Sequence, residues 1–202
     1  EVERRVKPIW VAGAEKVSTR TLHVLRPDDG AIAGEVAVAD ATHVDQAVDA
    51  AHRVQYELSA LPAHRRASAL DHVARRLLER IEHFAALITA EGGKPDQWAR
   101  VEVERAAATF RIAAEEARRW SGELQRLDTD AAGDGRIALN RKVSRGPVLG
   151  ITPFNFPLNL VAHKVAPALA VGAPIVVKPA PATPMTALAL GDLLAETDLP
   201  PR

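Results

Sequence analysis

Asn155 and Lys178 are the polar residues of this chain that are best placed to do chemistry. Each lies at or just beyond the end of a short apolar run, VLGIT (148–152) or PIVVK (174–178). A side-chain amide can donate hydrogen bonds without carrying a charge, whereas an ammonium group attracts anionic or hydroxyl oxygens. Polar groups of these two kinds at the ends of apolar runs indicate a ligand-binding crevice.

The two apolar runs are predicted to be neighbouring strands of a parallel sheet. Both are rich in β-branched residues and bounded by Pro or Gly, as is typical of strands that are buried on both faces. Residues 157–172 between them have helical periodicity, with Pro157 in the first turn and Gly172 at the end, and a second helix is expected from Thr183 or Pro184. A right-handed crossover then brings the carboxyl ends of both strands to one edge, where ligands settle in open α/β sheets.

A simpler interpretation of both residues remains open from spacing alone. Asn155 could cap the helix that begins near Pro157, because Asn is a favoured N-cap residue, and Lys178 could merely be a solvated turn residue. No GxGxxG pattern follows the first strand, so the usual dinucleotide-binding fingerprint is absent from the sequence.

The region before the strands is predicted to be helical. Apolar residues recur at intervals of three and four over 42–61, with Thr42 as the N-cap and Pro62 at the junction to the next helix. That second pattern runs without a break to Gly92-Gly93, and a third helix is expected over 96–121.

Residues 124–146 are predicted to form a hairpin arm. A polar, Gly-containing turn separates ELQRL from RIALNRKVSR, and four basic residues make the second half cationic. Because no aromatic residues are interleaved with the basic ones, we favour a sheet edge protected by positive charge over a nucleic-acid contact. Such an arm is suited to packing on another subunit.

Composition limits the classes of protein that the chain can belong to. It has 202 residues, 47% of them hydrophobic, with 26 Lys plus Arg and 26 Asp plus Glu, so no overall field favours nucleic acid or an acidic membrane. No apolar run is long enough to cross a membrane, and Glu1–Lys7 lacks the apolar region of a secretory signal. We therefore expect a cytoplasmic protein with neither a nucleic-acid nor a membrane partner.

The chain contains no cysteine. This excludes disulfides, cysteine-based zinc sites and a thiol nucleophile within these residues, and no metal site is expected.

The segment ITPFNFPLNLVAHKVAPALAVGAPIVVKPAPATPMTAL (151–188) closely resembles the aldehyde dehydrogenase superfamily, and EGGKP…EV…TFRIAAEEARRWSGE before it is similar to the helical region of those proteins. The resemblance implies an α/β fold in which N-terminal helices pack on a parallel Rossmann-like sheet with a protruding β-hairpin arm. It also implies an N-terminal portion that is incomplete relative to the family. The expected parts are a helical region of the cofactor-binding domain (1–123), an oligomerisation arm (124–146) and the first βαβα unit of the nucleotide-binding sheet (147–202), with the catalytic domain absent.

Family members oxidise aldehydes to acids with NAD or NADP, through a thiohemiacetal on a cysteine, hydride transfer and thioester hydrolysis. By resemblance, Asn155 is the residue that donates to the oxyanion, and Lys164 is a lysine that lies deeper in the catalytic site. A neutral donor held between Pro153 and Pro157 is physically suited to this role, because it stabilises developing negative charge without a change of protonation.

By resemblance, Lys178 binds the adenosine ribose or its 2′-phosphate. Pro181 stands where NAD-preferring relatives often have a glutamate that would repel a phosphate, so we expect NADP to be accepted at least as well as NAD. The expected cofactor-binding residues are Ile151, Thr152, Pro153, Phe154, Lys178, Ala180 and Pro181.

Because these residues lack the cysteine nucleophile, we expect the chain alone to be inactive on aldehydes. The favoured interpretation is the N-terminal part of an aldehyde dehydrogenase that assembles as a homodimer or homotetramer through its arm. A non-catalytic nucleotide-binding or assembly module and a pure interaction protein remain the alternatives. TPFNFPLN resembles branches that act on small aldehydes such as succinate semialdehyde, lactaldehyde or glyceraldehyde 3-phosphate.

Overall fold

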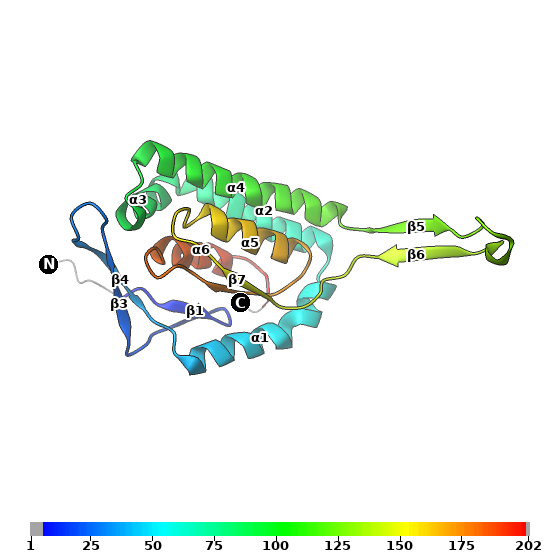
Figure 1. Ribbon diagram of the computed structural model, residues 1–202, viewed down its shortest axis with the longest axis horizontal. Helices are drawn as coiled ribbons and strands as arrows, with labels where there is room; N and C mark the ends of the chain where they lie inside the picture. Colours follow the sequence, from blue (N-terminus) through cyan, green and yellow to red (C-terminus); the bar gives the residue numbers. More distant parts are fainter. Residues whose placement is uncertain (1–5, 201–202) are drawn as a thin grey trace.

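The computed structural model describes residues 6–200 and contains the expected strand–helix–strand–helix unit (Figure 1). Strands β7 and β8 are parallel and pair from Val148 opposite Ile175 to Ile151 opposite Lys178. Gly172 follows the first helix of the unit with φ +79°, a left-handed conformation that glycine adopts without steric cost. The elements of the unit are β7 (Val148–Ile151), α5 (Asn159–Ala170), β8 (Ile175–Lys178) and α6 (Met185–Ala195).

The expectation that both strands are buried on both faces is wrong for the described residues. Helix α5 covers the face of β7 to which Gly150 belongs, since a Cβ on Gly150 would meet the stem of Lys164. Leu149 and Ile151 alternate to the opposite face, where their side chains are 65% and 60% exposed. β7 is therefore apolar on a face that residues 6–200 leave exposed.

Four helices precede this unit, and one expected helix is in fact two. The chain leaves helical geometry at Arg80 (φ −111°, ψ 26°), so the pattern that was read as continuous to Gly92-Gly93 is divided there. The periodicity stays in phase across Arg80 because both helices bury their apolar faces in one core. The helices are α1 (Ala41–Ala60), α2 (Ala63–Glu79), α3 (Ile81–Gly92) and α4 (Asp96–Arg119).

Asp40, not Thr42, is the N-cap of α1. The carboxylate of Asp40 accepts a hydrogen bond from the backbone N–H of His43 at 3.0 Å, and the His43 ring accepts one from the backbone N–H of Asp40. This reciprocal capping box uses His at the position where Glu or Gln is usual, and the sequence reading had therefore passed over it.

The main core lies where α2, α4 and α5 pack side by side (Figure 1). Alanines line α4 at the contacts, which lets the helix backbones approach closely, and Phe84 and Phe110 fill the larger spaces with at most 1% exposure. The three helices form a layer above the β7–β8 pair, and packing against α2 and α4 holds α5 in place.

Residues 9–37 form two antiparallel ladders, which were not predicted from the sequence. The first is tied to α6, where Asp192 accepts hydrogen bonds from Lys7 at 2.9 Å and from the Trp10 ring at 3.0 Å. Most of the segment read as lacking a secretory signal, Glu1–Lys7, lies outside the described residues. The strands are β1 (Ile9–Val11), β2 (Ala14–Lys16), β3 (Thr21–Leu25) and β4 (Ile32–Ala37).

The hairpin arm is confirmed as a protruding two-stranded ribbon (Figure 1). Strand β5 (Gly122–Arg126) pairs with β6 (Ile137–Arg141), and a short 3₁₀ turn, η1 (Ala131–Gly133), lies in the connection. The ribbon begins two residues earlier than expected and contacts little else in this chain. No helix within residues 6–200 is both long and apolar enough to cross a membrane.

Candidate functional site

The loops that carry Asn155 and Lys178 leave the same edge of the sheet. Ile151 lies opposite Lys178 in the parallel register, and the backbone N–H of Thr152 donates to the carbonyl of Lys178 at 3.2 Å, so pairing continues to the last residue of each strand. The hydroxyl of Thr183 donates to the carbonyl of Phe154 at 3.3 Å, which joins the two loops beyond the strands. The strand register and this hydrogen bond bring the two loops together at one edge of the sheet, as the strand pattern predicted.

Asn155 does not cap the helix that follows it. The first described turn of α5 receives no hydrogen bond from a side chain at the N-cap position, and Asn155 is exposed. The backbone carbonyl of Asn155 accepts a hydrogen bond from Lys94 Nζ at 3.2 Å. Its side chain is therefore available to a ligand at the sheet edge, and the capping interpretation is wrong.

A buried carboxylate from another helix caps α5 instead. Glu102 of α4 is 1% exposed, and its Oε1 accepts hydrogen bonds from the backbone N–H groups of Leu158 and Asn159 at 3.0 and 3.1 Å. Its second oxygen pairs with Lys94, whose ammonium also lies 3.8 Å from the centre of the Phe156 ring. Glu102 thus faces both a cation and the positive end of the α5 dipole.

The N-terminus of α6 is capped in the same way. Glu91 of α3 is 2% exposed and accepts hydrogen bonds from the backbone N–H groups of Met185 and Thr186 at 2.6 and 2.9 Å. Burial raises the pKa of Glu91 above its ordinary value, and these hydrogen bonds oppose the shift.

Both helix N-termini of the unit therefore already hold a protein carboxylate. In many nucleotide-binding sheets the free N–H groups at such a terminus bind a phosphate. Here Glu102 and Glu91 occupy that position. A ligand at this edge of the sheet would therefore meet loop residues and Lys178 in place of free helix N-termini.

The predicted cofactor-binding residues are of two kinds. Pro153, Phe154, Lys178 and Pro181 are exposed, whereas Thr152 and Ala180 are buried and can present only their backbone. The ammonium of Lys178 makes one long hydrogen bond, at 3.4 Å, to the carbonyl of Pro179. Among residues 6–200, no carboxylate lies within ion-pair distance of Lys178.

Lys164 crosses the sheet close to the same loops. It is half-buried on α5, and its Cδ lies 3.4 Å from where a Cβ on Gly150 would stand. Gly150 thus leaves the room in which the lysine stem passes over β7. This packing places the stem of Lys164 against the strand that leads to the Asn155 loop.

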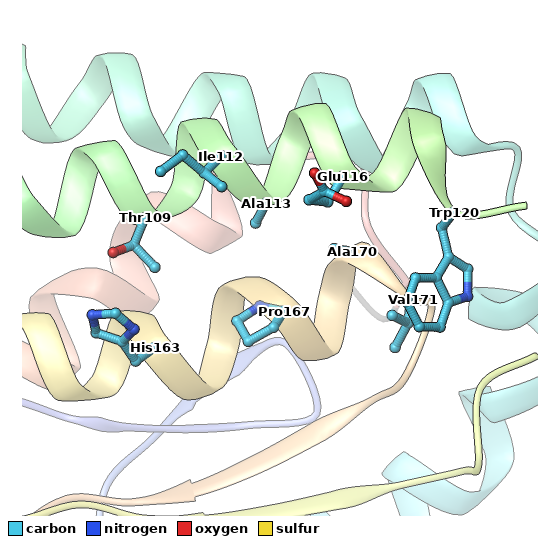
Figure 2. A pocket seen from close by; sticks show the side chains of 9 residues that line it. All are labelled: Thr109, Ile112, Ala113, Glu116, Trp120, His163, Pro167, Ala170 and Val171. Carbon is cyan, nitrogen blue, oxygen red and sulfur yellow. The ribbon is translucent and has the colours of Figure 1, made fainter.

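A hollow that the described residues enclose lies elsewhere. It has a volume of about 390 Å³ and runs between α4 and α5 toward the base of the arm, with Trp120 at one end (Figure 2). None of the residues predicted to act on substrate or cofactor lines it. Nor does any group of His, Asp and Glu within the described part of the chain have the arrangement of a metal site.

Sequence reasoning missed Glu91, Glu102 and Lys94. The two glutamates fall on the apolar faces of their helices, Glu91 in phase with Phe84 and Ile88, and Glu102 in phase with Ala99 and Ala106. A charged residue on a core-facing stripe is a signal that could have been used, because such residues are rarely buried without a partner.

The sequence model of the aldehyde dehydrogenase family matches residues 10–202. The 3-sulfolactaldehyde dehydrogenase of Priestia aryabhattai is 40% identical over 95% of this chain and 39% of its own length. The lactaldehyde dehydrogenase of Escherichia coli is 39% identical over 89% of this chain and 36% of its own. The chain thus spans about two fifths of the length of these curated relatives.

Solved structures give the same result. Aldehyde dehydrogenase 21 from Physcomitrella patens, in complex with the reaction product succinate, superposes with a TM-score of 0.94 at 40% identity, covering 98% of this chain and 41% of that one. An NADP-dependent glyceraldehyde-3-phosphate dehydrogenase from Bacillus halodurans, complexed with NADP, has a TM-score of 0.92 at 33% identity and covers 97% and 42%.

Proposed function

This chain belongs to the aldehyde dehydrogenase family, and we propose that it supplies the cofactor-binding edge and the oxyanion donor for NAD(P)-dependent oxidation of an aldehyde to a carboxylic acid. The observation that carries the proposal is the parallel register that sets Ile151 opposite Lys178. It brings a neutral amide donor, Asn155, and a cation to one edge of the sheet.

The residues at this edge fit a nicotinamide dinucleotide. Lys178 offers an ammonium group with no carboxylate partner among the described residues, and the exposed Pro153, Phe154 and Pro181 provide flat apolar surface beside it. The nicotinamide, when bound, supplies the hydride acceptor of the reaction. The backbone of Ile151, Thr152 and Ala180 completes the surface that holds the cofactor.

NADP is the cofactor that this edge should accept at least as well as NAD. A 2′-phosphate would be attracted by Lys178, and Pro181 provides no carboxylate to repel it. The relative from Bacillus halodurans is described as NADP-dependent and was crystallised with NADP, which supports the assignment.

Asn155 is proposed to donate its side-chain amide to the oxygen of the reacting aldehyde. Losing one oxyanion donor typically costs about 3–4 kcal/mol of barrier. Lys164 is proposed to act deeper in the same site, where its stem packs over Gly150. The thiol nucleophile must come from outside these 202 residues, since they contain no cysteine.

We propose a small, polar aldehyde as substrate. The relatives named above act on lactaldehyde and 3-sulfolactaldehyde, and one crystal structure holds succinate. These compounds share a short carbon chain with a hydroxyl or an anionic group.

The arm is proposed to join subunits into a homodimer or homotetramer. Leu124 and Leu139 lie opposite each other in the ribbon with exposures of 63% and 80%, and Ile137 lies on the same face with 63%. An apolar stripe of this kind on a protruding ribbon is costly in water unless another surface covers it.

A second candidate, a non-catalytic nucleotide-binding module, is favoured only by the absence of cysteine. Both candidates predict cofactor binding by the 202-residue chain, and they differ in whether a thiol-bearing polypeptide is needed with it. The coding sequence beyond Arg202 distinguishes them, because only the first candidate predicts that a cysteine and a strand-end glutamate are encoded there.

Calorimetric titration of the 202-residue chain with NADP and with NAD tests the proposed edge. We expect NADP to bind at least as tightly as NAD, and Lys178→Met to weaken NADP about tenfold, the loss of one charge-assisted contact. Lys142→Met, which removes a cation from outside the site, is the matched control. Much tighter binding of NAD would reject the NADP assignment, and no binding of either would reject the edge.

A further inference from the structure

The loop that carries Asn155, residues 152–158, is held near its middle by Lys94, which lies in the connection between α3 and α4. Lys94 Nζ bonds to the Asn155 carbonyl at 3.2 Å, pairs with the carboxylate of Glu102 and lies 3.8 Å from the centre of the Phe156 ring. One ammonium group therefore contacts Asn155, the next residue Phe156, and Glu102, which caps α5.

The position of Lys94 is itself tightly restricted. The preceding residue, Gly93, adopts φ +66° at the end of α3, where a Cβ would crowd Pro27. The following residue, Pro95, is the N-cap of α4. The side chain of Lys94 is 17% exposed. Because its backbone is fixed on both sides, the ammonium is a fixed point against which a loop can be located.

Glu102 extends the same arrangement to the end of the loop. One of its oxygens accepts from Leu158 and Asn159 while the other pairs with Lys94. Both of these anchors lie on the C-terminal side of the Asn155 Cα. On its N-terminal side the carbonyl of Phe154 accepts a hydrogen bond from the Thr183 hydroxyl at 3.3 Å, so the exposed Asn155 side chain is attached to backbone that is held on both sides.

We propose that Lys94 is a positioning residue for Asn155: acting with Glu102 and Phe156, its ammonium fixes the backbone from which the Asn155 amide is directed to the reacting oxygen. The inference rests on the proposed function of Asn155. It explains why a lysine is half-buried here, where an apolar residue would fill the space without desolvating a charge. Precise placement matters because an oxyanion donor is effective only when it is preorganised.

The test follows the side-chain amide NMR signal of Asn155, assigned by its loss in Asn155→Ala, together with hydrogen exchange of the backbone amides of Phe154, Asn155 and Phe156. Lys94→Met keeps the stem and removes the charge. We expect it to shift the Asn155 side-chain signal and to speed exchange of the loop about tenfold. Lys94→Arg, which keeps the cation, should restore most of the native signal.

Two matched variants separate positioning from general stability. Lys7→Met removes the cation of another ion pair, with Asp192, and Glu91→Gln alters the equivalent cap of α6. Both should leave the Asn155 signal unchanged even where they lower stability. If Lys94→Met does not fold, Phe156→Leu, which removes only the ring, should shift the signal in the same direction.

The proposal would be overturned if the Asn155 signal of Lys94→Met were the same as in the native chain. Where Phe156→Leu replaces that variant, the same outcome in Phe156→Leu would overturn it. Titration of the same samples with NADP distinguishes this from failure of the proposed function. NADP bound normally with Asn155 indifferent to Lys94 removes only the positioning role. A native chain that binds no NADP removes the cofactor site, while the dependence of Asn155 on Lys94 can still be observed.

Discussion

The N-termini of α5 and α6 are built alike and differ in one charge. Each is capped by a buried glutamate from an earlier helix, Glu102 for α5 and Glu91 for α6. Only Glu102 has a lysine beside it; among the described residues no cation forms an ion pair with Glu91. The cation is present at the cap whose loop carries Asn155, whereas the loop before α6 follows Lys178 and carries Pro181.

This difference shows two ways of keeping a carboxylate in a protein interior. Lys94 forms an ion pair with Glu102, whereas Glu91 has no cation partner among the described residues and accepts hydrogen bonds from the backbone N–H groups of Met185 and Thr186 at the positive end of the α6 dipole. The raised pKa of Glu91, caused by burial, is the consequence. A helix terminus can therefore hold a buried carboxylate by itself, but at the expense of that group's acidity.

The largest expected effect is on global stability. Glu102→Ala should lower the free energy of unfolding by about 3–5 kcal/mol, because it leaves Lys94 buried without its partner as well as two N–H groups without acceptors. Glu91→Ala should cost less, about 1–3 kcal/mol, since only N–H groups are left. Urea unfolding followed by circular dichroism measures both. Equal losses would mean that the cation adds nothing to the α5 cap.

The pH dependence of stability should separate Glu91 from an exposed ion-paired carboxylate. Because the folded-state pKa of Glu91 is raised, its favourable contribution is present below its ordinary pKa of 4.5 and is lost as pH rises through the folded value. The native chain should therefore lose stability relative to Glu91→Gln as pH increases above 4.5.

Glu196 should give the opposite sign. Hydrogen bonds from Arg76, and then from His72, lower its pKa to about 2, so its contribution is present above 4.5 and is lost as pH falls toward 2. As the pH rises from about 2 to 4.5, the native chain should gain stability relative to Glu196→Gln. Urea midpoints measured between pH 3 and 7 test both signs, and parallel curves for the two variants would contradict the assignment.

The next effect concerns the cofactor loop after β8. Pro181→Glu introduces a carboxylate near Lys178 and should weaken NADP about tenfold relative to NAD, because a phosphate is repelled while ribose hydroxyls gain an acceptor. Asn155→Ala, on the other loop, should leave the NADP to NAD ratio unchanged. Calorimetric titration of both cofactors gives the ratio, and a shift caused by Asn155→Ala would show that the loops do not have separate roles.

The smallest effect is expected from the arm, which contributes to neither cap. Leu139→Ser should change the free energy of unfolding by no more than about 0.5 kcal/mol, because this side chain is 80% exposed. The proposed association through the arm should nevertheless weaken, which sedimentation velocity can detect. A large loss of stability in a monomeric sample would show that the ribbon packs on its own chain.

Much of the secondary structure followed from the sequence. The β7–α5–β8–α6 unit, α4 and the hairpin were predicted because proline and glycine mark their ends and the period of apolar residues changes between strand and helix. Thr42 was wrong because Asp40 two residues earlier caps the helix, and the break at Arg80 was missed because the periodicity stays in phase across it. The ladders of residues 9–37 were missed because their short strands do not alternate clearly.

By itself the sequence determined which local structures form and that Asn155 and Lys178 lie at the ends of adjacent strands, because backbone preferences and apolar periodicity act over a few residues. Tertiary structure alone decided what holds those ends. Glu91, Glu102 and Lys94 lie between 56 and 95 positions away from the backbone groups they bind. Buried carboxylates find their partners by packing in three dimensions, and no local pattern in the chain records which helix terminus each one reaches.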